Sequence, residues 1–217
     1  MTLQQADNPG QMQVSRDTRA EFSHLHKYWH SGHNKVGVRV NAGEYYVSGE
    51  DEVIQTVLGS CISVCVHDPV NRIGGMNHFL LPHDEGGHRL SNSDPAGYRT
   101  RYGATAMEHL FNSVFKLGSA REQLQIKIFG GGNVLPTTMQ IGALNATFAR
   151  DYLTREGLTV VADDVEGPWS REVRFLPQTG DAFVRRLAAD DDEIRRNETR
   201  YLEQVSRTKS DDDIELF

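Results

Sequence analysis

A cysteine after a short turn, together with a histidine further along the chain, forms the most reactive combination in this sequence. Gly59 and Ser60 precede Cys61, and His78 lies in the next apolar segment. A free thiol has a pKa of about 8.5, so a neighbouring imidazole can raise its reactive fraction by taking the proton. The backbone N–H groups of Gly59 and Ser60 could hold an oxyanion. These residues indicate a thiol nucleophile with its base.

Cys61 is also consistent with an ordinary core cysteine, because free cysteine is among the most buried residue types. Cys65 lies within the same apolar segment, and we expect it to be a core thiol. On an extended strand the two cysteines share one face and lie about 13 Å apart. A disulfide requires Cα atoms within about 7 Å. His67 shares this face but lies about 20 Å from Cys61 along the strand, which is too far for it to act as the base.

Apolar periodicity predicts the elements that must position these residues. Strands are expected near 36–40, 45–47, 53–58, 62–66, 74–81, 124–129, 158–162, 172–176 and 181–187, and helices near 102–117 and 141–156. Segments 62–66 and 74–81 form a hairpin with His78 near the middle of its second arm. The glycine run 130–133 lacks the lysine of a phosphate-binding loop, so we expect a tight turn that brings backbone close to the site. The fold class is α/β (α+β), with mixed β-sheets and two main helices packed on them.

The composition divides the chain into three parts. Residues 1–35 are polar and predict a flexible extension, with a short helix near Glu21–Trp29; residues 36–188 predict the catalytic domain; residues 189–217 predict a charged tail that could form one helix. The polar segment 83–100 is expected to be a loop. Because it directly follows the histidine strand, we expect this loop to border the active site.

Charge and hydropathy exclude several classes of function. The net charge is −7 and no strongly basic block occurs, which argues against nucleic acid as a partner. No apolar run approaches the ~20 residues that span a bilayer, and the N-terminus lacks signal-peptide features, so we expect a cytoplasmic protein without membrane insertion. The histidines at 24, 26, 30 and 33 have no supporting carboxylate or cysteine, and a solvated segment explains them better than a metal site. We expect no metal and no cofactor.

Several of these segments resemble the CheD family, the chemoreceptor glutamine deamidases of bacterial chemotaxis. The resemblance rests on the stretch 57–65 (VLGSCISVC), on 74–78 (GGMNH) and on the Leu-Pro pair at 81–82. Weaker matches follow in the same order at 101–103, 106–107, 127–131, 141–145, 175–177 and 179–180. The likeness covers roughly residues 36–188. The segment 163–171 matches only loosely, and both charged ends exceed the compact family core.

The resemblance implies a cysteine-hydrolase type of fold and a defined set of catalytic residues. Cys61 corresponds to the nucleophile and His78 to the catalytic histidine. The family has a third catalytic residue, a threonine upstream of the cysteine, for which Thr56 is the candidate here. Gly59 and Ser60 would supply the oxyanion site.

The expected activity is deamidation of glutamine side chains to glutamate in methyl-accepting chemoreceptors, on their cytoplasmic helical bundle, with release of ammonia. A CheC-type phosphatase is a further possible partner. Two alternatives remain open at this stage. One is a non-catalytic regulator that docks on a receptor or phosphatase, and the other is a thiol methylesterase that acts at the same receptor sites.

Overall fold

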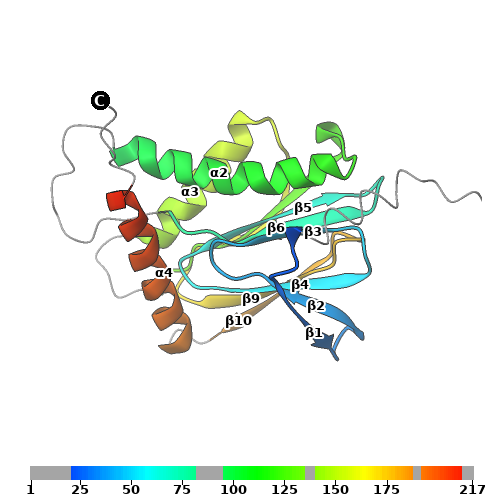
Figure 1. Ribbon diagram of the computed structural model, residues 1–217, viewed down its shortest axis with the longest axis horizontal. Helices are drawn as coiled ribbons and strands as arrows, with labels where there is room; N and C mark the ends of the chain where they lie inside the picture. Colours follow the sequence, from blue (N-terminus) through cyan, green and yellow to red (C-terminus); the bar gives the residue numbers. More distant parts are fainter. Residues whose placement is uncertain (1–20, 82–94, 135–139, 188–191, 212–217) are drawn as a thin grey trace, which may run out of the picture.

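The computed structural model describes residues 21–81, 95–134, 140–187 and 192–211. Within them, two five-stranded sheets are stacked and helices cover one of the sheets (Figure 1). The first sheet has the order β1 (His26–His30), β2 (Lys35–Arg39), β4 (Glu52–Leu58), β9 (Ser170–Phe175) and β10 (Ala182–Leu187). The second has the order β3 (Tyr45–Ser48), β6 (Ile73–Asn77), β5 (Ile62–Asp68), β7 (Gln125–Gly130) and β8 (Val160–Val165). The described helices are α2 (Pro95–Lys116), α3 (Ile141–Arg155) and α4 (Asp192–Asp211), with a short 3₁₀ turn at Arg121–Gln123.

The strand β5 lies at the centre of this arrangement. It pairs antiparallel with both β6 and β7, and all seven of its residues are buried. Figure 1 shows α2 and α3 over one face of its sheet and the other sheet against the opposite face. A strand covered on both faces needs a nearly continuous run of apolar and small residues, which is what ISVCV supplies. The predicted α/β class with mixed sheets is therefore confirmed.

The N-terminal segment differs from the sequence prediction. The helix expected near Glu21–Trp29 is wrong, because residues 22–25 form a turn and residues 26–29 belong to β1, which pairs antiparallel with β2. Phe22 is buried before the strand, where its ring packs edge-on against Tyr45 and Tyr46. Because of this ring packing and the β1–β2 pairing, part of the expected extension at residues 1–35 belongs to the folded domain. The division of the chain at residues 35–36 and 188–189 stays a prediction.

Two further expectations are corrected at element ends. The predicted loop 83–100 is too long at its C-terminal end, because α2 already begins at Pro95. Proline suits the first turn of a helix, since its missing N–H has no helical partner there. The rest of that loop, and the expectation that it borders the active site, lie outside the described residues. His78 is not in mid-strand: β6 ends at Asn77, and His78 follows directly.

The charged C-terminal segment forms the long helix α4, which is a third helix besides the two that were predicted as the main ones. Figure 1 shows α4 standing against one end of the two sheets, close to the start of α3. Ile194 and Leu202 on this helix are buried, so it packs on the domain. None of the helices in the described part of the chain is long and apolar enough to cross a membrane.

Candidate active site

The residues Gly59, Ser60 and Cys61, here called the cysteine turn, connect β4 to β5. A second turn, Gly130–Gly132 at the end of β7, holds them through two backbone hydrogen bonds. Gly131 N–H donates to the carbonyl of Cys61 and Gly132 N–H donates to that of Gly59, both at 2.7 Å. Gly130 has φ +107°, and a Cβ there would lie 2.2 Å from the Cys61 carbonyl oxygen. Only glycine permits this approach, so the predicted tight turn close to the site is confirmed.

Asn145 on α3 holds the remaining carbonyl of the cysteine turn. Its Nδ2 donates to the Ser60 carbonyl at 2.8 Å, and its Oδ1 accepts from Leu81 N–H at 3.0 Å. Asn145 is fully buried. It therefore ties the cysteine turn to the segment that follows His78. In the sequence Asn145 lies in the expected helix 141–156 and in the family match at 141–145, and neither gave it this role, although an amide among buried apolar positions is a signal of it.

With its carbonyls held by the scaffold, the cysteine turn directs its three N–H groups to one place. Gly59 N–H and Cys61 N–H donate to Oε1 of Glu198, at 2.8 and 3.1 Å. Ser60 N–H and Ser60 Oγ–H donate to Oε2, at 2.8 and 2.7 Å. Successive N–H groups that converge in this way form an anion-binding concavity. The same concavity suits the oxyanion of a tetrahedral intermediate on the adjacent thiol.

Strand pairing brings His78 close to Cys61. Ile62 and Phe79 exchange two backbone hydrogen bonds, of 2.9 and 3.0 Å, and Cys61 and His78 are the residues directly before them. Residues in this diagonal relation on antiparallel strands are about 7–8 Å apart, within reach of longer side chains.

Thr56 fixes the orientation and the tautomer of the histidine ring. Its Oγ1 lies 2.7 Å from the Val40 carbonyl and 2.8 Å from His78 Nδ1. A carbonyl only accepts, so the threonine hydroxyl donates to Val40 and accepts from Nδ1–H. This assigns the proton to Nδ1 and leaves the lone pair on Nε2. The Nε2 atom is buried and has no hydrogen-bond partner among the described residues.

Burial keeps both reactive groups neutral in this conformation. It lowers the pKa of His78 from 6.5 to about 4, so the imidazole is uncharged and able to accept a proton. It also raises the pKa of the Cys61 thiol, and the charge and hydrogen bonding of Glu198 raise it further. The site as it stands holds a thiol and a neutral imidazole, which is the resting form of a general-base pair.

Comparisons with known proteins identify the family of this chain. The family described as CheD chemotactic sensory transduction matches residues 80–186. A "Probable chemoreceptor glutamine deamidase CheD" from Saccharophagus degradans is 40% identical over 199 residues, which cover 90% of this chain and 91% of the relative. The chain belongs to the CheD family. Proteins with the same description from Hahella chejuensis and Cupriavidus pinatubonensis are 40% and 46% identical, over 90% and 77% of this chain and 92% and 77% of theirs.

The structure of this CheD-family chain brings together all the site residues that the sequence singled out. Cys61, Gly59 and Ser60 form one turn, while His78 and Thr56 are hydrogen-bonded to each other beside it. Sequence reasoning missed three contributors: the Val40 carbonyl, Asn145 and Glu198. Of these, Glu198 gave the weakest signal, because its contacts lie 137 to 139 residues away along the chain.

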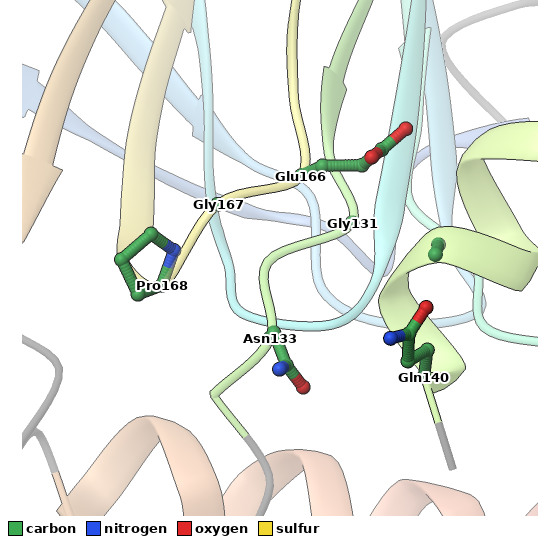
Figure 2. Close-up of a pocket in the computed structure, with 7 residues that line it drawn as sticks. Gly131, Asn133, Gln140, Glu166, Gly167 and Pro168 are labelled. Atoms are coloured by element: carbon green, nitrogen blue, oxygen red, sulfur yellow. The ribbon is translucent and has the colours of Figure 1, made fainter.

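A pocket of about 300 Å³ lies beside the turn Gly130–Gly132 (Figure 2). Its lining consists of Gly131, Asn133, Gln140, Ala143, Glu166, Gly167 and Pro168. Cys61 is not among these residues and has no exposed surface. The pocket therefore does not give access to the thiol, which is covered by α4 instead.

The histidine-rich segment forms a strand and the turn after it. His26 and His30 lie on β1, and His33 lies in the turn that follows it. Among the described residues no group of three or more histidine, cysteine or acidic side chains is placed to hold a metal ion.

Proposed function

We propose that this protein hydrolyses the side-chain amide of glutamine residues in chemoreceptors, with Cys61 as nucleophile and His78 as general base. The observation that carries the proposal is the convergence of three turn N–H groups beside a buried thiol and an imidazole whose Nε2 lone pair is unpartnered among the described residues. The names of the relatives support the amide of glutamine as the bond that is cleaved.

The first half of the reaction forms a thioester. His78 Nε2 takes the thiol proton of Cys61, and the thiolate attacks the carboxamide carbon of the substrate glutamine. The oxygen of the tetrahedral intermediate becomes negatively charged and accepts hydrogen bonds from the N–H groups of the cysteine turn. The imidazolium then gives its proton to the amide nitrogen. The C–N bond breaks, ammonia leaves and the acyl group stays on sulfur.

The second half of the reaction returns the enzyme to its starting state. Water enters the position that ammonia left, and His78 takes a proton from it as it attacks the thioester carbon. The C–S bond breaks, the proton passes to the Cys61 sulfur and glutamate is released. Thr56 does not touch the substrate in this scheme. Its hydroxyl keeps one proton on His78 Nδ1, so that the Nε2 lone pair is available to accept the proton of the thiol or of water.

The substrate segment that we propose is the cytoplasmic helical bundle of a methyl-accepting chemoreceptor, reached by an enzyme acting in the cytoplasm. Association with a CheC-type phosphatase stays a prediction.

The test is ammonia release from a purified receptor fragment, combined with mass spectrometry of the fragment. Wild type should release ammonia and convert glutamine to glutamate, and Cys61→Ala should do neither. Equal release by both proteins would contradict the thiol mechanism. Loss of a methyl group from methylated glutamates, with glutamines left intact, would instead identify a methylesterase. Binding without either reaction would identify a docking regulator.

A further inference from the structure

The helix α4 covers the cysteine turn as a packed element. Its buried residues Ile194, Glu198 and Leu202 recur every four positions and so form one stripe that faces the domain. Tyr201, beside this stripe, is partly buried, and its hydroxyl shares a hydrogen bond with that of Tyr102 on α2. The surface that α4 covers, here called the groove, thus includes the turn that carries the thiol.

Glu198 is the unusual member of this stripe. A buried carboxylate is costly unless hydrogen bonds replace its hydration. Glu198 is 5% exposed, and each of its carboxylate oxygens accepts two hydrogen bonds from the cysteine turn. The concavity that would hold the oxyanion of the reaction is therefore filled by a glutamate side chain carried on a helix.

A glutamate side chain is also the product of the proposed reaction. We propose that α4 is a product mimic, and that the groove it fills is the docking groove for a substrate helix that presents its glutamine where Glu198 lies. This inference rests on the proposed function and adds how the substrate binds. The substrate carbonyl oxygen takes the place of Oε1, where it meets the N–H groups of Gly59 and Cys61.

The contacts of α4 then define which residue types a substrate helix should carry around its target glutamine. Positions four residues before and four residues after the target glutamine occupy the sites of Ile194 and Leu202, so they should be apolar. The position three residues after it occupies the site of Tyr201. The hydroxyl of Tyr201 lies against Gly43, since a Cβ built on Gly43 would be 2.7 Å from it. The same hydroxyl shares a hydrogen bond with Tyr102. The substrate residue three positions after the glutamine should therefore be able to hydrogen-bond to Tyr102.

The groove favours carboxylate over carboxamide. Ser60 N–H points at Oε2 of Glu198, and the NH₂ group of a glutamine in that orientation offers it no acceptor. The built-in glutamate is therefore held more firmly than a substrate glutamine, and α4 must be displaced by contacts along the rest of the substrate helix. While α4 is seated, the Cys61 side chain has no exposed surface and the raised pKa keeps it protonated.

The full-length Glu198→Gln variant tests the geometry directly. The introduced amide lies where the substrate amide would, so attack by Cys61 followed by hydrolysis should release ammonia and convert residue 198 back to glutamate. Tandem mass spectrometry of the peptide containing position 198 measures this conversion over time. The double variant Glu198→Gln with Cys61→Ala should keep the amide. An amide that stays intact in the single variant, while the same preparation deamidates a receptor fragment, would overturn the proposal and leave the proposed function standing.

A second measurement does not depend on catalysis. In Glu198→Ala the iodoacetamide reaction of Cys61 should be at least about tenfold faster than in wild type, because α4 loses its charge-assisted hydrogen bonds. Cys65 is the internal reference, and Thr199→Ala, on the exposed side of α4, is the matched control. Unchanged alkylation of Cys61 would overturn the proposal. Faster alkylation without ammonia release from receptor by any variant or by wild type would overturn the proposed function, and with it the assignment of the groove to a substrate.

Discussion

Cys61 and Cys65 are both fully buried free thiols four residues apart, yet they are buried by different parts of the molecule. Cys65 lies within β5, between Met76 on one neighbouring strand and Lys127 on the other, and burial raises its pKa to about 12. Cys61 lies one residue before β5, and its turn is covered by α4, a helix that belongs to neither sheet. The comparison teaches that complete burial of a thiol says little about its reactivity until the element that buries it is known.

Each cysteine also has a histidine on or beside its strand. Replacing these two histidines one at a time should give the largest difference in activity. His78→Gln should lower kcat for receptor deamidation by about 10²- to 10⁴-fold, because it removes the general base. His67→Gln, near Cys65, should leave kcat close to wild type. Ammonia release measures both, with circular dichroism to verify folding. A larger loss in the His67 variant than in the His78 variant would break the comparison.

The next effect concerns the hydroxyl that orients His78. Thr56→Val should lower kcat by about 10- to 100-fold, since it removes the group that fixes the ring and its tautomer. Thr56→Ser retains the hydroxyl and should recover most of the activity. The Michaelis constant should change little, because Thr56 does not touch the substrate. Steady-state kinetics of the two variants would contradict this role if serine were as impaired as valine.

The residue pattern together with the family resemblance was enough to indicate this half of the site. Cys61, His78 and Thr56 are polar residues at or near the ends of strongly apolar strands. Pairing of Ile62 with Phe79 brings Cys61 and His78 together, whereas Thr56 reaches His78 from β4 in the other sheet. The glycine run was also predictable, because positive φ at Gly130 and the close approach to the Cys61 carbonyl both require glycine. Local patterns of this kind predict contacts in the folded protein, because the two strands of a hairpin fix their own register.

The other half depends on contacts that no local pattern encodes. The Glu21–Trp29 segment was predicted as a helix, but pairing with β2 makes much of it a strand, and pairing partners are a tertiary property. Glu198 lies in a stripe that looks like a weak solvated helix, and only its distant partners at the cysteine turn give the residue a role. Asn145 belongs to the same class, because an amide on a helix stripe does not reveal which carbonyl it will hold.

Removing Asn145 should therefore weaken the folded state as well as the site. Asn145→Ala leaves the Ser60 carbonyl and Leu81 N–H without their partner, and should lower the free energy of unfolding by about 1–3 kcal/mol. Leu144→Ala, on the exposed side of the same helix, should change it by less than about 0.5 kcal/mol. Urea denaturation separates the two variants. Equal destabilisation would show that Asn145 acts only through the helix.

The last expected effect is acid sensitivity. Because burial lowers the pKa of His78 from 6.5 to about 4, the unfolded chain binds its proton at higher pH than the folded one. The contribution of His78 to stability is therefore complete above pH 6.5 and is lost as the pH falls towards 4, by roughly 3 kcal/mol at about 1.4 kcal/mol per pKa unit. Burial lowers the pKa of His67 in the same direction. His78→Gln should flatten this dependence only in part, as measured by urea denaturation at a series of pH values. A slope unchanged from wild type would show that His78 is not titrating on unfolding.

The central claim is that the Cys61 sulfur carries the acyl group of the substrate glutamine. Rapid acid quenching of wild type during turnover on a receptor fragment, followed by digestion and tandem mass spectrometry, tests it most directly. The account predicts a receptor peptide joined to Cys61 through a thioester, with ammonia already lost and Cys65 unmodified. An adduct on Cys65, or continued ammonia release by Cys61→Ala, would contradict it.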